Sequence, residues 1–318
     1  MRLKLPWRKN RDLAAGGMYS AVDTPADQHE QEMVRGAEML QDHQVETAEL
    51  GDLAKLPPFR PVAIRLIRLF DQTDVRVDEV SALVESDPSM ASEMLAIVNS
   101  PLFGVQQTVS SPAHAITLLG VDRTKSLAAT LAMRSMMQGG PRTPIVRRFW
   151  IHSIATATIA RHLARLFRIA PEQAHVAGLL HDLGRSGILS AHPEEYSQLA
   201  ITAHESTAAI LAQEQVIFGM THCQAGALLA KAWSLPAIFQ EVAGHHHETT
   251  SPNPTVALVQ FCCSLADDFM YQSIHRTDVR KPEETIRQCA PEALHAPLMA
   301  ELEALGAAID AAISALDF

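Results

Sequence analysis

The sequence predicts an all-α protein, and three features of the chain support that fold class. First, Asp87-Pro88 and Ser111-Pro112 each place a capping side chain directly before a proline, a preferred start of a helix. Second, the apolar residues after such starts recur with the helical period and the runs end at glycine, asparagine or proline. Third, no segment alternates apolar and polar residues as a half-buried β-strand does.

The start and stop signals place the helices in order along the chain. The first clear helices are expected at 88–98, 112–119 and 122–138, and the last two end at glycines. The helix that carries His181 is expected to end on a glycine, in the run from Gly178 to Gly184. Further helices are expected at 145–167, 171–181, 193–204, 207–218, 221–233, 236–246 and 254–270, followed by a helical extension at 283–316.

Composition excludes several classes of protein. The chain has 318 residues, 47% of them hydrophobic, so it can bury a large core. A net charge of -10 gives no positive field for a nucleic-acid backbone. No segment is apolar enough for a stable membrane insertion, the amino terminus lacks the apolar region of a signal peptide, and the four cysteines lack paired spacing. We therefore expect a soluble cytoplasmic protein with reduced thiols.

Histidines in apolar helices are the most informative feature of the chain, which contains 15 of them. At about 100° per residue, Asp267 shares a helix face with Cys263 and Met270, whereas Asp268 points toward Ser264. By the same reasoning, His152 lies on an apolar face. A buried carboxylate must be protonated, hydrogen-bonded, ion-paired or bound to a metal.

Small residues beside the other histidines indicate that helices approach closely there. Gly178 precedes His181 by three residues, and Gly226 follows His222 by four. A close junction ringed by imidazole and carboxylate groups suits one or two divalent transition metals such as Fe, Mn or Zn. Any single histidine could instead be a core or capping residue. The candidate ligands are His152, His181, Asp182, His222, His246, His247 and Asp267.

This ordered set resembles the HD superfamily of metal-dependent phosphohydrolases, in the branch that contains the HD-GYP cyclic-dinucleotide phosphodiesterases. The resemblance implies that the His-Asp pair and the last aspartate hold metal and that the other histidines complete the centre. Segments of the amino-terminal half point to a narrower relative, the HDOD domain of bacterial signalling proteins. The likeness to this domain extends over about residues 53–269. The segments that carry this likeness are Leu56-Pro57-Pro58, 84–90, 99–103, 115–120, 149–153 and 226–236.

The HDOD resemblance implies an amino-terminal helical lobe packed on an HD-like helical core. We therefore expect a flexible tail at 1–50, the lobe at 51–140, the core at 141–272 and a carboxy-terminal extension at 273–318. Two departures from the active HD-GYP pattern concern substrate handling. Arg185 stands where those enzymes have a lysine, and the Gly-Tyr-Pro segment is missing after Glu248. Asp182 and Arg185 are the candidates for any catalytic role.

Three functions follow as hypotheses. The leading one is a regulatory HDOD protein that binds a signalling protein or a small nucleotide ligand and has little or no catalysis. The second is a metal-dependent phosphodiesterase or phosphohydrolase acting on a nucleotide or cyclic dinucleotide. The third is an inert helical scaffold whose histidines are core residues. The oligomeric state is left open.

Overall fold

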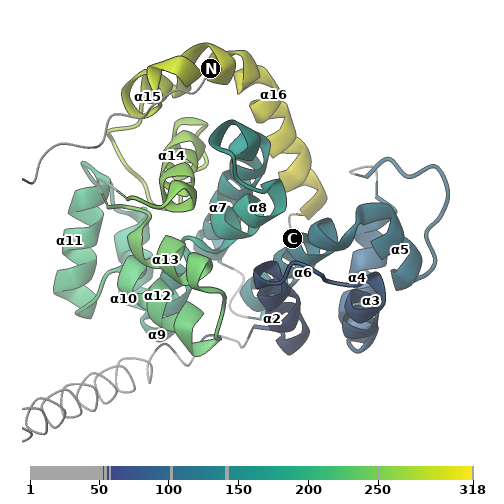
Figure 1. Cartoon of the computed structure of the whole chain (residues 1–318). Coiled ribbons are helices and arrows are strands. Elements are labelled where there is room, and N and C mark those ends of the chain that lie inside the picture. Colours follow the sequence, from purple (N-terminus) through teal and green to yellow (C-terminus); the bar gives the residue numbers. More distant parts are fainter. Residues whose placement is uncertain are drawn as a thin grey trace, which may run out of the picture. The chain divides into compact units, whose positions relative to one another are not determined.

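The computed structural model describes residues 53, 56, 59–100, 103–139, 143–248 and 251–316. Every regular element in these ranges is a helix, which confirms the predicted all-α class (Figure 1). The tail expected at 1–50 lies outside the described residues. Within the described part, no helix is both long and apolar enough to cross a membrane.

The first helices pack on one another in the part of Figure 1 coloured purple to blue. Asp87 accepts a hydrogen bond from the Met90 amide at 3.0 Å, and Ser111 accepts one from the His114 amide at 3.2 Å. Both predicted helix starts are therefore real caps. The elements are α2 (Pro61–Arg68), η1 (Leu69–Asp71), α3 (Val77–Glu85), α4 (Pro88–Val98), α5 (Pro112–Leu119) and α6 (Val121–Gln138).

Helix α7 (Pro144–Leu163) contacts several other helices in the middle of the fold. The longest contact surface joins α7 to α8 (Pro171–Leu180), with η2 (Ala164–Phe167) between them in the chain. Helix α7 also contacts α14 (Pro254–Asp268), which contacts α8 as well, and α16 (Glu292–Leu316), on which α15 (Pro282–Cys289) packs. A Cβ added at Gly178 would lie 2.9 Å from the Cα of Ala157, so the α7–α8 contact requires glycine there.

The remaining helices follow the His181-Asp182 pair in the chain. The first of them, at Leu183–Ala191, was not expected from the sequence. Gly184 does not end a helix, because the chain turns at Asp182 and immediately forms α9. The glycine serves a close crossing instead: a Cβ added there would lie 1.9 Å from the carbonyl oxygen of His222. The elements are α9 (Leu183–Ala191), α10 (Pro193–Ile201), α11 (Thr207–Phe218), α12 (His222–Ala232) and α13 (Ala237–His245).

The end of α14 gives a second correction. The helix stops at Asp268, so Met270 does not share the inward face with Asp267; it has a φ of 71° and is 77% exposed. Asp268, expected to point toward Ser264, is buried and accepts a hydrogen bond from the Arg280 amide at 3.1 Å. Met270 differs because the helical phase is lost after Asp268, whereas Asp268 is still part of the helix and is buried together with its contact to the Arg280 backbone.

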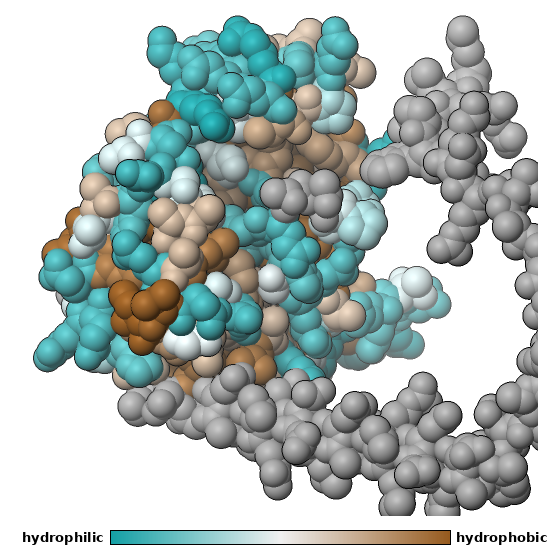
Figure 2. Space-filling model, turned by 90° about the vertical axis from the view of Figure 1, so that its left-hand side faces the viewer, coloured by the Kyte–Doolittle hydropathy of each residue, from teal (hydrophilic) through white to brown (hydrophobic). Residues whose placement is uncertain are grey.

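Helix α11 lies at the edge of the described fold. Its buried residues are Ile210 and Glu214, whereas Val216 is 85% exposed and Ile217 is 50% exposed. Figure 2, which views the side of the molecule where α11 lies in Figure 1, shows brown apolar patches among mostly hydrophilic side chains. Ile210 and Glu214 therefore face the core, and Phe218 at the end of the helix packs against Tyr196.

One large hydrophobic cluster includes residues from α2 to α6 and from α7 to α14. A second cluster joins α7 and α14 to α15 and α16. The hydrophobic clusters thus contain residues from both sides of positions 140 and 272. The domain boundaries expected at those positions stay predictions.

Replacing Gly184 by alanine should destabilise the fold strongly. The new Cβ would meet backbone atoms of His222 and Gly226, which cannot rotate away. We expect the free energy of unfolding to fall by about 3 kcal/mol or more, at the upper end of overpacking costs. Urea unfolding measures this. The control is Gly306→Ala in α16, where the nearest atom is 3.8 Å away and alanine should stabilise by up to about 1 kcal/mol. Equal stability of the two variants would contradict the close crossing.

Candidate metal centre

The seven candidate ligands come together where α7, α8, α12, α13 and α14 meet. Six of them are at most 5% exposed, and His247 is half-buried. Helical phase therefore predicted correctly that His152 and Asp267 face inward. The residues and their elements are His152 in α7, His181 and Asp182 between α8 and α9, His222 at the start of α12, His246 and His247 after α13, and Asp267 in α14.

Backbone carbonyls orient three of the imidazole rings. The Nδ1 of His152 donates to the carbonyl of Tyr271 at 2.7 Å, and that of His181 donates to the carbonyl of Gly178 at 2.7 Å. The Nδ1 of His246 is 3.1 Å from the carbonyl of Val242. Because a carbonyl can only accept, each ring carries its proton on Nδ1 and, when neutral, presents the Nε2 lone pair to the interior.

The inward Nε2 atoms face one another. The Nε2 atoms of His152 and His181 are 3.2 Å apart. Burial lowers the pKa of His181 well below its usual value, against the opposing charge of Asp182, so this ring is neutral near pH 7. Two lone pairs at that distance repel each other unless a cation binds to them. Metal-ligating histidines have this arrangement, with Nδ1 held by an acceptor.

Asp182 lies between two groups of ligand atoms. Its Oδ2 is 3.7 Å from the Nε2 atoms of both His152 and His181. Its Oδ1 is 3.3 Å from the Nε2 of His222 and 3.4 Å from that of His246. Burial opposes ionisation of this carboxyl, but Arg185, whose Nε donates to Oδ2 at 2.8 Å, and the surrounding histidines together outweigh it and hold the pKa well below its usual value.

The donor atoms of these groups fit a metal ion. In each group they lie within 4.8 Å of one another. The buried side-chain atoms that lack a hydrogen-bond partner among the described residues include three of these donor atoms: Asp182 Oδ1, His246 Nε2 and His247 Nε2. Unsatisfied buried acceptors are costly, and coordination would satisfy them. Imidazole nitrogen, carboxylate oxygen and thiolate sulfur are ligands for Fe, Mn or Zn. The groups are Asp182, His222, His246 and His247, and His152, His181 and Cys263.

Two of the contributors were not expected from sequence. The Sγ of Cys263 lies 3.6 Å from the Nε2 of His152. The signal for it was present, since this cysteine shares the inward face of Asp267. The second is Glu214 of α11, which is fully buried and accepts hydrogen bonds from both the backbone amide and the Nδ1 of His222, at 2.8 and 2.7 Å. Because its neighbours in the sequence are polar, nothing in the sequence indicated that this glutamate is buried.

Glu214 also ties the centre to Arg185. Its Oε1 accepts from the Arg185 guanidinium at 3.1 Å and from the Tyr196 hydroxyl at 2.7 Å. Burial would raise the pKa of this carboxyl, but the charges and hydrogen bonds of His222 and Arg185 lower it to about 2. The glutamate is therefore ionised and fixes the His222 ring with Nε2 toward Asp182.

Asp267 lies behind His152, on its Nδ1 side, at 3.5 Å from that nitrogen. It belongs to neither group of ligand atoms, because its other oxygen pairs with the Arg276 guanidinium at 3.0 Å. Its role as a metal ligand stays a prediction. Arg185, the other residue considered for catalysis, is 3% exposed and engaged by Asp182 and Glu214.

A segment between α14 and α15, residues 273–277, closes the centre from outside; we call it the strap. Its backbone pairs with His204, through bonds of 3.0 Å from the His204 amide to the His275 carbonyl and 2.9 Å from the Thr277 amide to the His204 carbonyl. Arg276 reaches from the strap to Thr207 and Asp267. The cavity beneath is about 10 Å³, lined in part by His152, His247 and Cys263. That volume is about the size of one water molecule.

Comparison with known sequences places most of the chain in one family. Residues 56–249 match the sequence profile of the HDOD domain. An uncharacterized protein of Treponema pallidum (strain Nichols) is 23% identical over 218 residues, which cover 67% of this chain and 42% of that protein. The chain thus spans about two fifths of the length of this relative.

Solved structures share the fold. An HDOD domain protein of unknown function from Geobacter sulfurreducens is 25% identical, with a TM-score of 0.60, over 80% of this chain and 92% of that one. A protein from Marinobacter aquaeolei, provisionally named a signal transduction protein, is 20% identical with a TM-score of 0.67 over 86% and 66%. One from Shewanella amazonensis, provisionally named a phosphohydrolase, is 19% identical with a TM-score of 0.62 over 85% and 98%.

Changing Glu214 to glutamine should weaken metal binding. The amide would turn a donor toward the Arg185 guanidinium or toward His222, so the ring would lose its fixed orientation. We expect the affinity for added Mn²⁺ or Zn²⁺ to fall roughly 10- to 100-fold, as for other residues that orient metal ligands. Competition with a chelator of known affinity measures it. Glu205→Gln, an exposed position just before α11, is the control and should bind as the wild type does. Unchanged affinity in Glu214→Gln would contradict this role.

Proposed function

Because the chain belongs to the HDOD family, we propose that it is a signal-transduction protein that acts by binding a ligand or a protein partner, with a metal ion held in a closed His/Asp centre. The observation that carries this proposal is the closure of the centre. The cavity under the strap, which is lined by three of the candidate ligands, His152, His247 and Asp267, has a volume of only about 10 Å³. A site for a nucleotide would need several hundred Å³, typically about 300 or more.

The residues that would hold the metal are those with inward Nε2 lone pairs, together with Asp182. His222, His246 and His247 would share one ion with the Oδ1 of Asp182, and His152, His181 and Cys263 offer a second group. A bound transition metal supplies positive charge and Lewis acidity at this point. In a closed centre its contribution is to folding, since it neutralises buried acceptors from several helices at once.

A second candidate function is a metal-dependent phosphohydrolase. The observation that favours it is that the ordered set expected from the HD superfamily converges almost completely at one point. Against it, Arg185 lines the cavity under the strap but its guanidinium is already paired with Asp182 and Glu214. The strap also stands between the ligand atoms and solvent. Binding without turnover is therefore the better supported function.

Metal content tests this proposal, with two neighbouring histidines as a matched pair. His246 is buried with its Nε2 toward Asp182, whereas the side chain of His245 is 50% exposed and pairs with Glu248. We expect untagged protein purified without chelator to contain about one or two transition-metal ions per chain. His246→Ala should lose at least one of them, and His245→Ala should keep the wild-type content. Elemental analysis of the three proteins measures this.

Turnover is measured on the same samples, with cyclic di-GMP and a generic phosphodiester substrate in the presence of Mn²⁺ or Fe²⁺. We expect none above background. Hydrolysis by the wild type that is lost in Asp182→Ala, with the fold retained, would favour the phosphohydrolase instead. Absence of metal even after reconstitution would favour the inert scaffold.

Opening the strap should release the metal faster. Arg276→Ala removes the contacts from the strap to Asp267 and Thr207. We expect the rate of metal loss to excess EDTA to rise roughly tenfold or more, since tenfold corresponds to only about 1.4 kcal/mol. Stopped-flow absorbance with Co²⁺-loaded protein follows the loss. The control is Arg280→Ala, an exposed side chain just beyond the strap, which should release metal at the wild-type rate. An unchanged rate in Arg276→Ala would mean that the strap does not limit access.

A further inference from the structure

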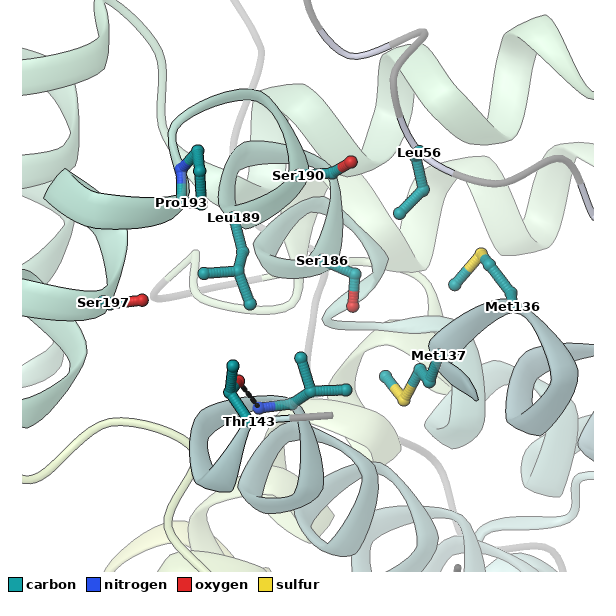
Figure 3. A pocket seen from close by; sticks show the side chains of 10 residues that line it. Leu56, Met136, Met137, Thr143, Ser186, Leu189, Ser190, Pro193 and Ser197 are labelled. Atoms are coloured by element: carbon teal, nitrogen blue, oxygen red, sulfur yellow. Dashed lines mark hydrogen bonds between the residues drawn. The ribbon is translucent and has the colours of Figure 1, made fainter. Parts of the chain in front are cut away.

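A cavity separate from the metal centre lies between α6, α7, α9 and α10 (Figure 3). Its volume is about 170 Å³, which is well above that of the cavity under the strap. In Figure 3, Ser186 and Leu189 point from α9 toward the start of α7, and Met137 approaches from α6. The cavity therefore has walls from helices that lie far apart in the sequence.

The lining of this cavity is apolar and uncharged. Leu56, Met136, Met137, Val146 and Leu189 supply most of the surface, and none of the described lining residues carries a charge. Methionine side chains are flexible and polarizable, so they adapt to ligands of different shape. An ionised ligand would lose its hydration there without gaining a countercharge, and that loss is costly. The lining thus selects for a neutral molecule.

Hydroxyl groups supply the polar part of the lining. Ser186, Ser190 and Ser197 have no hydrogen-bond partner within the described residues, whereas the Thr143 hydroxyl caps α7 by accepting from the Val146 amide at 3.3 Å. Each free hydroxyl can donate and accept. A few polar groups in an otherwise apolar cavity are the usual composition of a small-molecule site.

We infer that this cavity binds a small neutral amphipathic molecule, with an apolar body among the methionines and a hydroxyl or carbonyl group on the serines. A cavity of about 150 Å³ lined by apolar side chains can hold a benzene molecule. The ligand is therefore a ring or a chain of comparable size, such as a short alcohol. Nucleotides are too large and too charged for the cavity.

This inference rests on the proposed function as a ligand-binding signalling protein and names the ligand class. It also places the ligand next to the metal centre. Arg185 pairs with Asp182, and Ser186, the next residue in the chain, lines the cavity. Helix α9 is therefore a wall of both sites, and Gly184 holds it against α12. A ligand that shifts α9 would therefore change the geometry of both the cavity and the metal centre.

The test uses the full-length, metal-loaded protein with ¹³C-methyl methionine and 1-hexanol as the probe. Hexanol should shift the methyl resonances of Met136 and Met137 in a saturable manner. These two resonances are identified by their loss from the spectra of Met136→Leu and Met137→Leu. Hexanoate, of the same length but charged, should bind at least tenfold more weakly. Ser197→Leu, which fills the cavity from α10, should weaken hexanol binding at least tenfold. Gln198→Leu, the exposed neighbour that does not line the cavity, should not.

The outcomes separate this inference from the proposed function. No saturable shift at Met136 and Met137, equal binding of hexanoate, or equal binding by Ser197→Leu and Gln198→Leu would each overturn the inference. Thermal unfolding shows whether both variants are folded, and a soaked crystal of the wild type locates the probe if one variant is not. Metal content, measured on the same samples, reports on the closed centre whatever the probe does.

Discussion

The buried carboxylate of Asp182 sets the conditions for the rest of the centre. An anion that is 4% exposed must be compensated by partners in place. Arg185 supplies a permanent charge to one oxygen, and imidazoles surround the other. Glu214 in turn compensates Arg185 and orients His222. The charges alternate along this network, so removal of any member leaves another buried group without its partner.

Local signals predicted most of the fold because helix caps act over a few residues. Helix α9 was missed because no proline follows its N-cap residue, Asp182, and because Gly184 and Gly187 are typical of helix ends. What keeps a glycine at position 184 is the backbone of α12, 38 to 42 residues later, at His222 and Gly226. Contacts of that range cannot be derived from a local pattern.

The candidate site was predictable to the extent that it depends on helical phase. Phase turns His152 and Asp267 inward, and both are buried. It does not tell which partner an inward group meets: Asp267 meets Arg276 and the outer side of His152 rather than the shared interior. Nor could it find Glu214, whose significance comes from Arg185 on another helix. Direction is a property of one helix, whereas pairing depends on how several helices pack.

The strap has a further consequence that concerns the order of synthesis. Every candidate ligand, from His152 to Asp267, precedes the strap in the chain. A ribosome releases a chain from its amino terminus at roughly 5–20 residues per second. The side chains that can hold an ion therefore emerge before the segment that covers them. Under the proposed function, an ion would be able to enter the nascent protein during this interval, before the strap covers the candidate ligands.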